Sequence, residues 1–164
     1  MPSLHIRQFP DPILRKVADP IRKIDRNIEL FINSLIKFMK SQPGGVGIAA
    51  TQVGVLKQLA IVDVSSKIPG SKLLILINPI ILASGESGVF REGCMSLPDH
   101  TANVTRAERV AIKYQDIGLK TNEMTVFGLQ ARCIQHEVDH LHGKLFLDRV
   151  TSLKSDVFRR KRYL

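Results

Sequence analysis

The sequence predicts an α+β fold in which short antiparallel sheets pack around a central helix. Between residues 58 and 127, short runs rich in β-branched and aromatic residues are separated by Gly, Pro, Asn and Ser rather than by long helices. This pattern is typical of antiparallel sheets. Residues 129–141 then repeat apolar residues and histidines at steps of three and four, which is the spacing of one helix face.

Length and composition indicate a globular protein. The chain has 164 residues, of which 44% are hydrophobic and 24% charged, enough to bury a core. We therefore expect a single domain over residues 1–164, with a basic tail from about residue 154. The opening residues lack the apolar core of a secretory signal, and the longest apolar run, around residues 73–77, is too short to span a membrane. The two cysteines make no disulfide framework, so we expect a cytoplasmic protein with no membrane partner.

The formal net charge is +9, and much of the excess lies near the C-terminal end. Residues 149–164 contain six basic residues and one acidic residue, a side-chain balance of +5. One interpretation of this run is an anionic partner. The other is a solvated chain end, because charge runs at termini are more often exposed surface than binding sites.

Two helical segments are predicted in the first quarter of the chain. Asp11 followed by Pro12 is a typical start for a short helical turn, which Pro20 ends. Residues 26–40 carry apolar residues at helical spacing and lysines toward the end, so they predict an amphipathic helix. Residues 42–45, Gln-Pro-Gly-Gly, end it.

Residues 45–54 are mostly small, and Gln52 is the one amide among them. The stretch matches neither a dinucleotide-binding fingerprint nor a P-loop, because its third glycine is misplaced and no Lys-Ser/Thr pair follows. In one interpretation, the small residues let a substrate backbone approach while the Gln52 amide donates to a polarised carbonyl. In the other, the stretch is a glycine-rich turn and Gln52 is simply exposed.

A series of short strands is predicted beyond this stretch. The last of them form a hairpin that leads directly into the C-terminal helix. Residues 91–98 are expected to be a loop, because Gly93 and Pro98 bracket them and no strand or helix period survives. The expected strands are residues 58–64, 73–78, 80–83, 88–91, 104–114 and 124–127.

The C-terminal helix carries His136 and His140 four residues apart, so both imidazoles lie on one face and could share a metal ion. Glu137 lies about 100° further round, beside water that such a metal would activate. Gly143 is a natural C-terminal stop for this helix. A buried His pair can also be ordinary core, so the prediction depends on a third ligand.

Cys94, in the predicted loop, is the candidate for that third ligand. A thiolate at this position would complete a Cys-His-His set and leave a fourth position open to water, which is typical of catalytic sites. The alternative is that Cys94 is a small hydrophobic residue of the core.

Three segments taken together resemble the three ordered motifs of the peptide deformylase family. They are residues 45–52 (GVGIAATQ), 92–96 (EGCMS) and 135–140 (QHEVDH). The resemblance implies an enzyme that removes the formyl group from the N-terminal formyl-methionine of nascent bacterial or organellar proteins. It also implies one divalent metal ion, natively often Fe(II), with zinc, nickel or cobalt able to occupy the site. By this resemblance, Cys94, His136 and His140 are the ligands, Glu137 is the acid/base, and Gln52 and the backbone N–H of Met95 are the oxyanion donors.

The same resemblance implies a substrate pocket. Glycine walls would exclude acyl groups larger than formyl, and methionine would need an apolar slot. Candidates for the slot are Val46, Phe90, Leu129 and Cys133. The other candidate substrate-binding residues are Gly47, Glu92 and Gly93.

The chain departs from the family pattern in three places. Met95 stands where Leu is usual, a conservative change because the backbone N–H is the functional group. Many members carry an Arg shortly after the motif's Pro, where this chain has His100 and Thr101. Arg132 stands where related sequences are often apolar, and sequence alone does not tell which way it points.

Two competing functions remain open. A zinc peptidase shares the His-Glu-x-x-His helix, but it normally needs a third ligand downstream, and none of His142, Asp148 or Asp156 is suitably spaced. The second alternative is a basic RNA- or ribosome-binding domain with a structural metal; we expect no DNA partner. 

The tail from about residue 154 is expected to lie away from the chemistry. A short terminal helix would pack onto the body of the protein through Val157, Phe158 and Leu164. The basic run from Arg159 to Arg162 would then stay exposed to ribosomal RNA. The alternative is an unstructured end.

Overall fold

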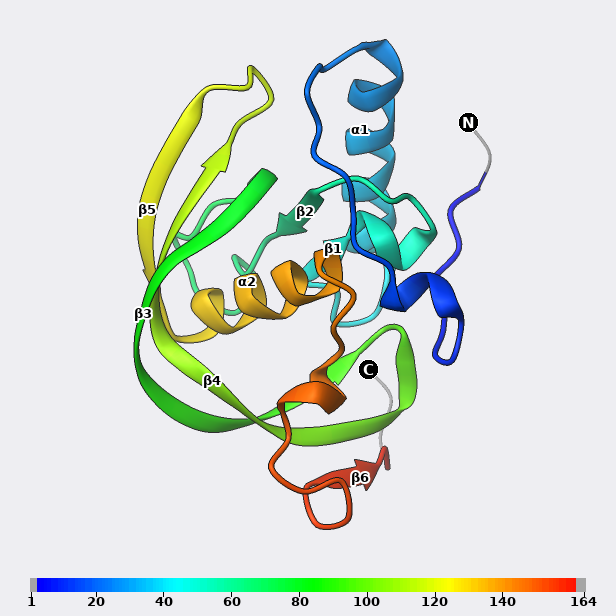
Figure 1. The fold of residues 1–164 in the computed structure, drawn as a ribbon, viewed down its shortest axis with the longest axis vertical. Helices are drawn as coiled ribbons and strands as arrows, with labels where there is room; N and C mark the ends of the chain where they lie inside the picture. The colour runs from blue at the N-terminus through cyan, green and yellow to red at the C-terminus, as the bar shows by residue number, and fades with distance from the viewer. Residues whose placement is uncertain (1–2, 162–164) are drawn as a thin grey trace.

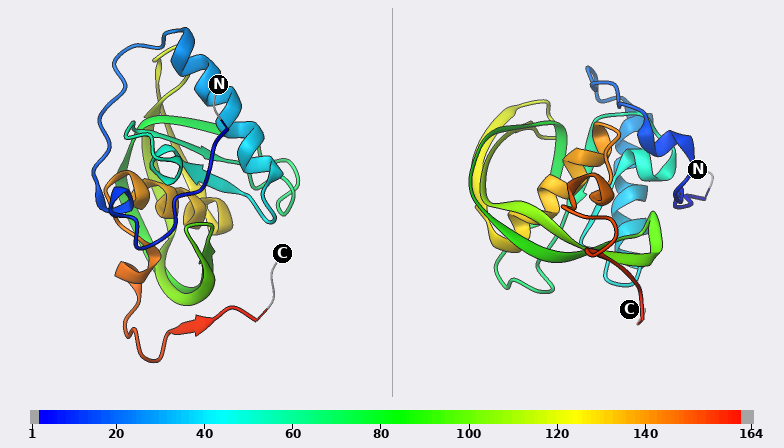
Figure 2. Two further views of the ribbon diagram at one scale, coloured as in Figure 1. Left: turned by 90° about the vertical axis from the view of Figure 1, so that its right-hand side faces the viewer. Right: turned by 60° about the horizontal axis from the view of Figure 1, so that its bottom comes forward.

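In the computed structural model, which describes residues 3–161, one antiparallel sheet curves around the central helix α2 (Gly128–Leu141) (Figure 1). The right-hand view in Figure 2 shows β3, β4 and β5 wrapped around α2, with α1 on the opposite side. The predicted α+β class is therefore confirmed. The strands follow the order β1 (Gly47–Ala49), β2 (Leu59–Val62), β3 (Leu74–Cys94), β4 (Leu97–Gln115) and β5 (Thr121–Phe127), and β6 (Val157–Arg159) pairs with β4.

The helical segments before the sheet agree with their sequence signals. The Asp11 carboxylate accepts the backbone N–H of Ile13 and caps the short helix η1 (Pro12–Arg15). The Asp25 carboxylate caps α1 (Arg26–Ser41) in the same way. The apolar face of α1 packs against β1, β2 and the short helix η2 (Ala50–Val53) in one hydrophobic cluster, which fixes the strand that reaches the site.

β3 and β4 are far longer than the expected strands. They span 21 and 19 residues and pair with each other along nearly their whole length. Register shifts fall near Asn78 and again at Gly93, so the residues expected to end strands instead form irregularities within one hairpin. The loop predicted at residues 91–98 is wrong: β3 runs to Cys94, β4 starts at Leu97, and a tight turn joins them.

Helix α2 occupies the concave side of this hairpin. Ala131, Ile134, Val138 and Leu141 bury themselves against residues of β1 to β5. The helix ends at Leu141, and Gly143 takes a φ of +74°, so the predicted glycine stop is confirmed. A third short helix, η3 (Phe146–Arg149), follows and packs beside η1 and β4.

The C-terminal segment belongs to the fold rather than forming a detached end. The helix predicted around Val157 and Phe158 is wrong, because these residues form β6, which pairs with β4 at Thr101 and Ala102. Val157 also packs onto the cluster that contains Cys94. Leu164 and Arg162 lie outside the described residues. Over residues 3–161, no helix has the length and apolar character needed to cross a membrane.

Candidate metal centre

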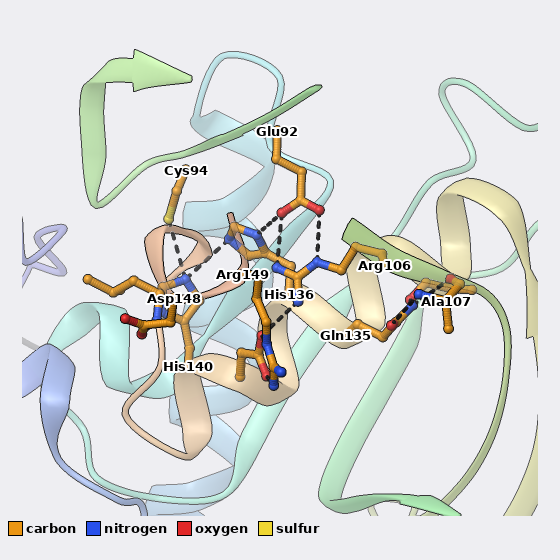
Figure 3. A network of polar contacts seen from close by, with 12 residues as sticks. Glu92, Cys94, Arg106, Ala107, Gln135, His136, His140, Asp148 and Arg149 are labelled. Atoms are coloured by element: carbon orange, nitrogen blue, oxygen red, sulfur yellow. Dashed lines mark hydrogen bonds and ion pairs between the residues drawn. The ribbon is translucent and has the colours of Figure 1, made fainter. Parts of the chain in front are cut away.

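Three potential metal ligands converge at the centre of the molecule. Cys94 comes from the end of β3, and His136 and His140 come from successive turns of α2 (Figure 3). The Cys94 Sγ lies 3.3 Å from His140 Nε2, which lies 3.2 Å from His136 Nε2. The three ligand atoms lie within 4.8 Å of one another. One thiol and two imidazoles converging in this way fit a transition-metal ion with a position left for solvent.

The surroundings of Cys94 favour its ionised form. Burial opposes ionisation, but the imidazoles of His140 and His136 lower the pKa of the Cys94 thiol well below its usual range. The thiolate is the form that binds metal. Cys133 differs, because burial and the nearby Glu137 charge raise the pKa of its thiol to about 11. Only one of the two cysteines is therefore prepared as a ligand.

A buried ionic network stands behind His136. The Glu92 carboxylate lies 2.9 Å from His136 Nδ1 and accepts two bonds from Arg106, at 2.8 and 3.0 Å. Arg106 also donates to Asp139 at 2.6 Å, and Arg149 donates to the same carboxylate at 2.9 and 3.0 Å (Figure 3). Positive and negative side chains therefore alternate from Arg149 at the surface to the imidazole of His136.

This network sets the chemistry of His136. Burial opposes ionisation of Glu92, but hydrogen bonds from His136 and Arg106 lower the pKa of its carboxyl to about 2. An ionised Glu92 holds a proton on His136 Nδ1 and leaves Nε2 free to bind metal. Glu92 also lines the site cavity, but its carboxylate is committed to these partners, which favours an orienting role over the expected substrate contact.

Glu137 is buried beside the convergent ligands. It is 3% exposed, and its Oε1 has no hydrogen-bond partner among the described residues. Burial is the main cause that raises the pKa of this carboxyl above its usual value. A Cβ at Gly47 would lie 2.6 Å from Glu137 Oε2. Glycine at position 47 is therefore what allows β1 to pass directly over the carboxylate.

Gln52 points into the same site from η2. It is 1% exposed, so the alternative of an exposed Gln in a glycine-rich turn is wrong. Its Oε1 accepts the Ala49 N–H at 3.0 Å, which leaves the amide N–H group directed toward Ser96 at 3.2 Å and Cys94 Sγ at 3.5 Å. The side chain is held as a donor aimed at the centre.

These groups open onto a cavity of about 540 Å³. Most predicted site residues line it, but His140, which is 1% exposed, and Phe90 are not among the lining residues. Phe90 lies behind Arg132, whose guanidinium sits 3.8 Å from the centre of its ring. The lining residues that were expected from the sequence are Val46, Gly47, Gln52, Glu92, Gly93, Cys94, Met95, Leu129, Cys133, His136 and Glu137.

Several residues of the site were missed by sequence reasoning. Arg106 is 4% exposed, but the predicted strand 104–114 also carries Glu108, Arg109 and Lys113, so its charge gave no distinctive signal. Asp139 lies within the His helix, but nothing in the motif indicates its partner Arg149. Arg160 reaches the cavity, which corrects the expectation that the tail lies away from the chemistry.

Comparisons with known proteins agree with one another. A family model described as polypeptide deformylase matches residues 3–156. The chain is 42% identical over 161 residues to a peptide deformylase of Thermodesulfovibrio yellowstonii, covering 98% of this chain and 97% of that protein. It is 39% identical over 154 residues to a peptide deformylase of Rhizobium meliloti, covering 93% and 88%.

Solved structures give the same result. A peptide deformylase from Legionella pneumophila superposes with a TM-score of 0.84 at 37% identity, covering 93% of this chain and 89% of that one. One from Synechococcus elongatus, in complex with actinonin, gives 0.85 at 38% identity, covering 94% and 82%.

Proposed function

The chain belongs to the polypeptide deformylase family, and we propose that the cavity beside Cys94, His136 and His140 is where it hydrolyses the formyl group from N-terminal formyl-methionine. The reaction breaks a linear amide, releases formate and leaves a free amino terminus. The observation that carries the proposal is the convergence of three ligand atoms within 4.8 Å beside a buried carboxylate and an oriented amide donor. We further propose that residues 1–164 work as a single domain.

Cys94, His136 and His140 would hold the metal ion on which the family depends. When bound, a metal ion supplies a Lewis acid that polarises a carbonyl and lowers the pKa of water from ~15.7 toward about 7. We propose Fe(II) as the native ion, as in much of the family, and the mixed thiolate and imidazole set also suits zinc, nickel or cobalt. Metal analysis after anaerobic purification tests this choice.

The protein side chains divide the remaining work. Glu137 takes the proton of the attacking water and passes it to the leaving amine, a role that suits a carboxyl whose pKa burial has raised above its usual value. The Gln52 amide and the Met95 N–H donate to the oxyanion, and removal of one such donor typically costs about 3 kcal/mol of barrier stabilisation. Because Gly47 and Gly93 have no side chains, the backbone at these positions comes close to the reacting carbon. The space left there admits a formyl group and excludes larger acyl groups.

Methionine selectivity follows from the apolar part of the cavity. Val46, Leu129 and Cys133 all line it and all pack against the main hydrophobic cluster. The high pKa of the Cys133 thiol, about 11, keeps it neutral, so it acts as an apolar wall. A thioether side chain therefore has a neutral surface to contact.

Formate release separates this function from its alternatives. The enzyme should release formate from formyl-Met-Ala and no acetate from acetyl-Met-Ala. A peptidase would instead cleave the Met-Ala bond of both, and a structural-metal RNA-binding domain would act on neither peptide. Cleavage of the peptide bond, or equal rates on both acyl groups, would contradict the assignment.

The substrate is an emerging chain, so we propose a bacterial-type cytoplasmic location and contact with the ribosome. Lys154, Arg159 and Lys161 are exposed at the C-terminal end, where they are available to rRNA phosphate. Replacing these three with Gln should weaken co-sedimentation with ribosomes and reduce its salt dependence.

A matched variant serves as the control for that measurement. Arg22, Lys23 and Lys72 are also exposed, and their replacement by Gln removes the same charge from other surfaces. Equal ribosome binding by the two triple variants would contradict the ribosome proposal.

A further inference from the structure

Positively charged side chains gather at the mouth of the site cavity. Four line it, and we call them the cationic rim: Lys67, Arg91, Arg132 and Arg160. Among the described residues, the carboxylates that line the same cavity are those of Glu92 and Glu137. Glu92 is neutralised by Arg106, and Glu137 lies at the bottom with the ligands, so the mouth itself carries excess positive charge.

Arg132 is held in place by an aromatic ring. It follows the first turn of α2, next to the apolar wall residue Cys133, and its guanidinium lies 3.8 Å from the centre of the Phe90 ring. It makes no ion pair with any described residue. Stacking fixes the planar group without cancelling its charge, so Arg132 presents a preorganised cation beside the path of the substrate.

Arg91 is held in a similar way. Its guanidinium lies 3.9 Å from the centre of the Phe158 ring, and it donates to Asn103 at 3.1 Å and Thr101 at 3.4 Å. All these partners are neutral, and among residues 3–161 Arg91 has no carboxylate within ion-pair distance. The ring that supports it comes from β6, so the C-terminal strand contributes to the rim.

Arg160, which directly follows β6, extends the rim. Its backbone N–H donates to the Asp99 carbonyl at 2.8 Å, and its guanidinium packs against the Cα of Gly93, one residue before Cys94. A side chain at position 93 would displace it. The C-terminal segment therefore places a cation close to His100 and Thr101, where many members of the family carry an arginine.

We propose that the cationic rim makes Arg91 and Arg132 specificity-determining residues that favour acidic side chains just downstream of formyl-methionine. The inference rests on the proposed function, which places the formyl group by Cys94 and the methionine side chain against Val46 and Leu129. An extended chain advances about 3.3 Å per residue, so the second and third residues after methionine reach the mouth. Charges there lie within the screening length of about 10 Å at 0.1 M salt.

The test compares three amidated peptides that differ only in charge: formyl-Met-Ala-Asp-Asp, formyl-Met-Ala-Asn-Asn and formyl-Met-Ala-Lys-Lys. At low salt, kcat/KM should be about tenfold higher for the Asp peptide than for the Lys peptide, falling to within about twofold near 1 M salt. Equal values at low salt would overturn the proposal. Because formate release from the Asn peptide reports the basic reaction, failure of the proposed function is seen separately.

Variants assign the preference to these residues. In the double variant Arg91→Gln, Arg132→Gln, the ratio for the Asp and Lys peptides should fall to within about twofold. Each ratio is taken within one protein, so a general loss of activity cancels. Arg132→Lys, which keeps the charge, should retain most of the preference. Lys113→Gln removes an exposed charge from β4 outside the cavity and should leave the ratio unchanged. A preference that survives in the double variant would contradict the assignment.

Discussion

At the scale of single residues, the two cysteines show how local surroundings assign chemistry. Cys94 is drawn toward the thiolate by two imidazoles, whereas burial and the Glu137 charge keep Cys133 neutral, with a thiol pKa of about 11. Both thiols face the same cavity. Only the first is prepared to bind a metal ion.

Cys94→Ala should therefore abolish metal binding, because it removes the anionic ligand and leaves two neutral imidazoles. Cys133→Ala changes a wall of the cavity and should keep about one metal ion per chain. Metal content measured after dialysis of both variants checks this. A metal-free Cys133→Ala variant, or a fully loaded Cys94→Ala variant, would refute the ligand assignment.

Sequence motifs identified the residues that meet at the centre but not the ones that hold them. The spacing of His136 and His140 is local, so helix geometry is enough to place both on one face. Arg106 reaches Asp139 across 33 positions of sequence, and such a contact leaves no periodic signal. Its burial is evident only once β4 is placed over α2.

At the scale of elements, the network through Arg106 joins β3, β4 and α2. Arg106 is buried between Glu92 and Asp139. Burial opposes its charge, but these two carboxylates outweigh that effect and raise the pKa of the guanidinium. The network stabilises the fold only while every charge keeps its partner. A buried carboxylate that loses its partner still carries the full free-energy cost of its removal from water.

Arg106→Met should lower the free energy of unfolding by about 3–5 kcal/mol, because it leaves two carboxylates without their shared partner. The control Arg109→Met changes an exposed residue of the same strand and should stay within about 0.5 kcal/mol. Urea denaturation at neutral pH measures both. Similar losses in the two variants would show that the network does not stabilise the fold.

Asp148 connects η3 to η1. Its carboxylate accepts the Leu145 N–H at 2.9 Å and pairs with Arg15. Burial opposes ionisation, but Arg15 and the Leu145 N–H together hold the pKa of the Asp148 carboxyl below its ordinary value of 3.8. A depressed pKa in the folded state stabilises the protein above the unfolded value, and this stabilisation is lost as pH falls through the folded value.

Asp148→Asn should therefore cost up to about 1 kcal/mol at pH 7, a modest figure because the carboxylate is more than a third exposed. The difference should shrink as pH falls below 3.8, where the wild-type group becomes neutral as well. Thermal melts from neutral to acid pH follow it. A difference that is the same at every pH would contradict the ionic role.

Strand ends were the least predictable part of the fold. Asn78 and the following proline interrupt the sequence pattern, yet β3 continues through them because Asn78 bonds to the Ile21 backbone and to Gln115. The side-chain amide of Asn78 thus anchors the irregular part of β3 to distant segments of the chain. A local pattern cannot reveal such partners, so one long hairpin was read as several short strands.

At the scale of the whole molecule, the C-terminal segment is the main revision. The sequence suggested a short terminal helix away from the chemistry, but β6 pairs with β4 instead. Phe158 of β6 supports Arg91 at the cavity, and Arg160, directly after β6, lines it. The paired residues of β4 and β6 lie more than fifty positions apart in the sequence, and β6 has only three residues. So short a strand shows no sequence pattern from which its pairing could be predicted. The fold class and the three family motifs were predictable because each depends on local spacing.

The central claim is that Cys94, His136 and His140 hold the metal while Glu137 moves the proton. Glu137→Gln separates these two roles, since it keeps the shape of the side chain and every ligand. The direct measurement is metal content and formate release from formyl-Met-Ala on one preparation of this variant. We predict about one metal ion per chain and a turnover lower by at least ~100-fold. A variant that is metal-free, or that releases formate at the wild-type rate, would contradict the claim.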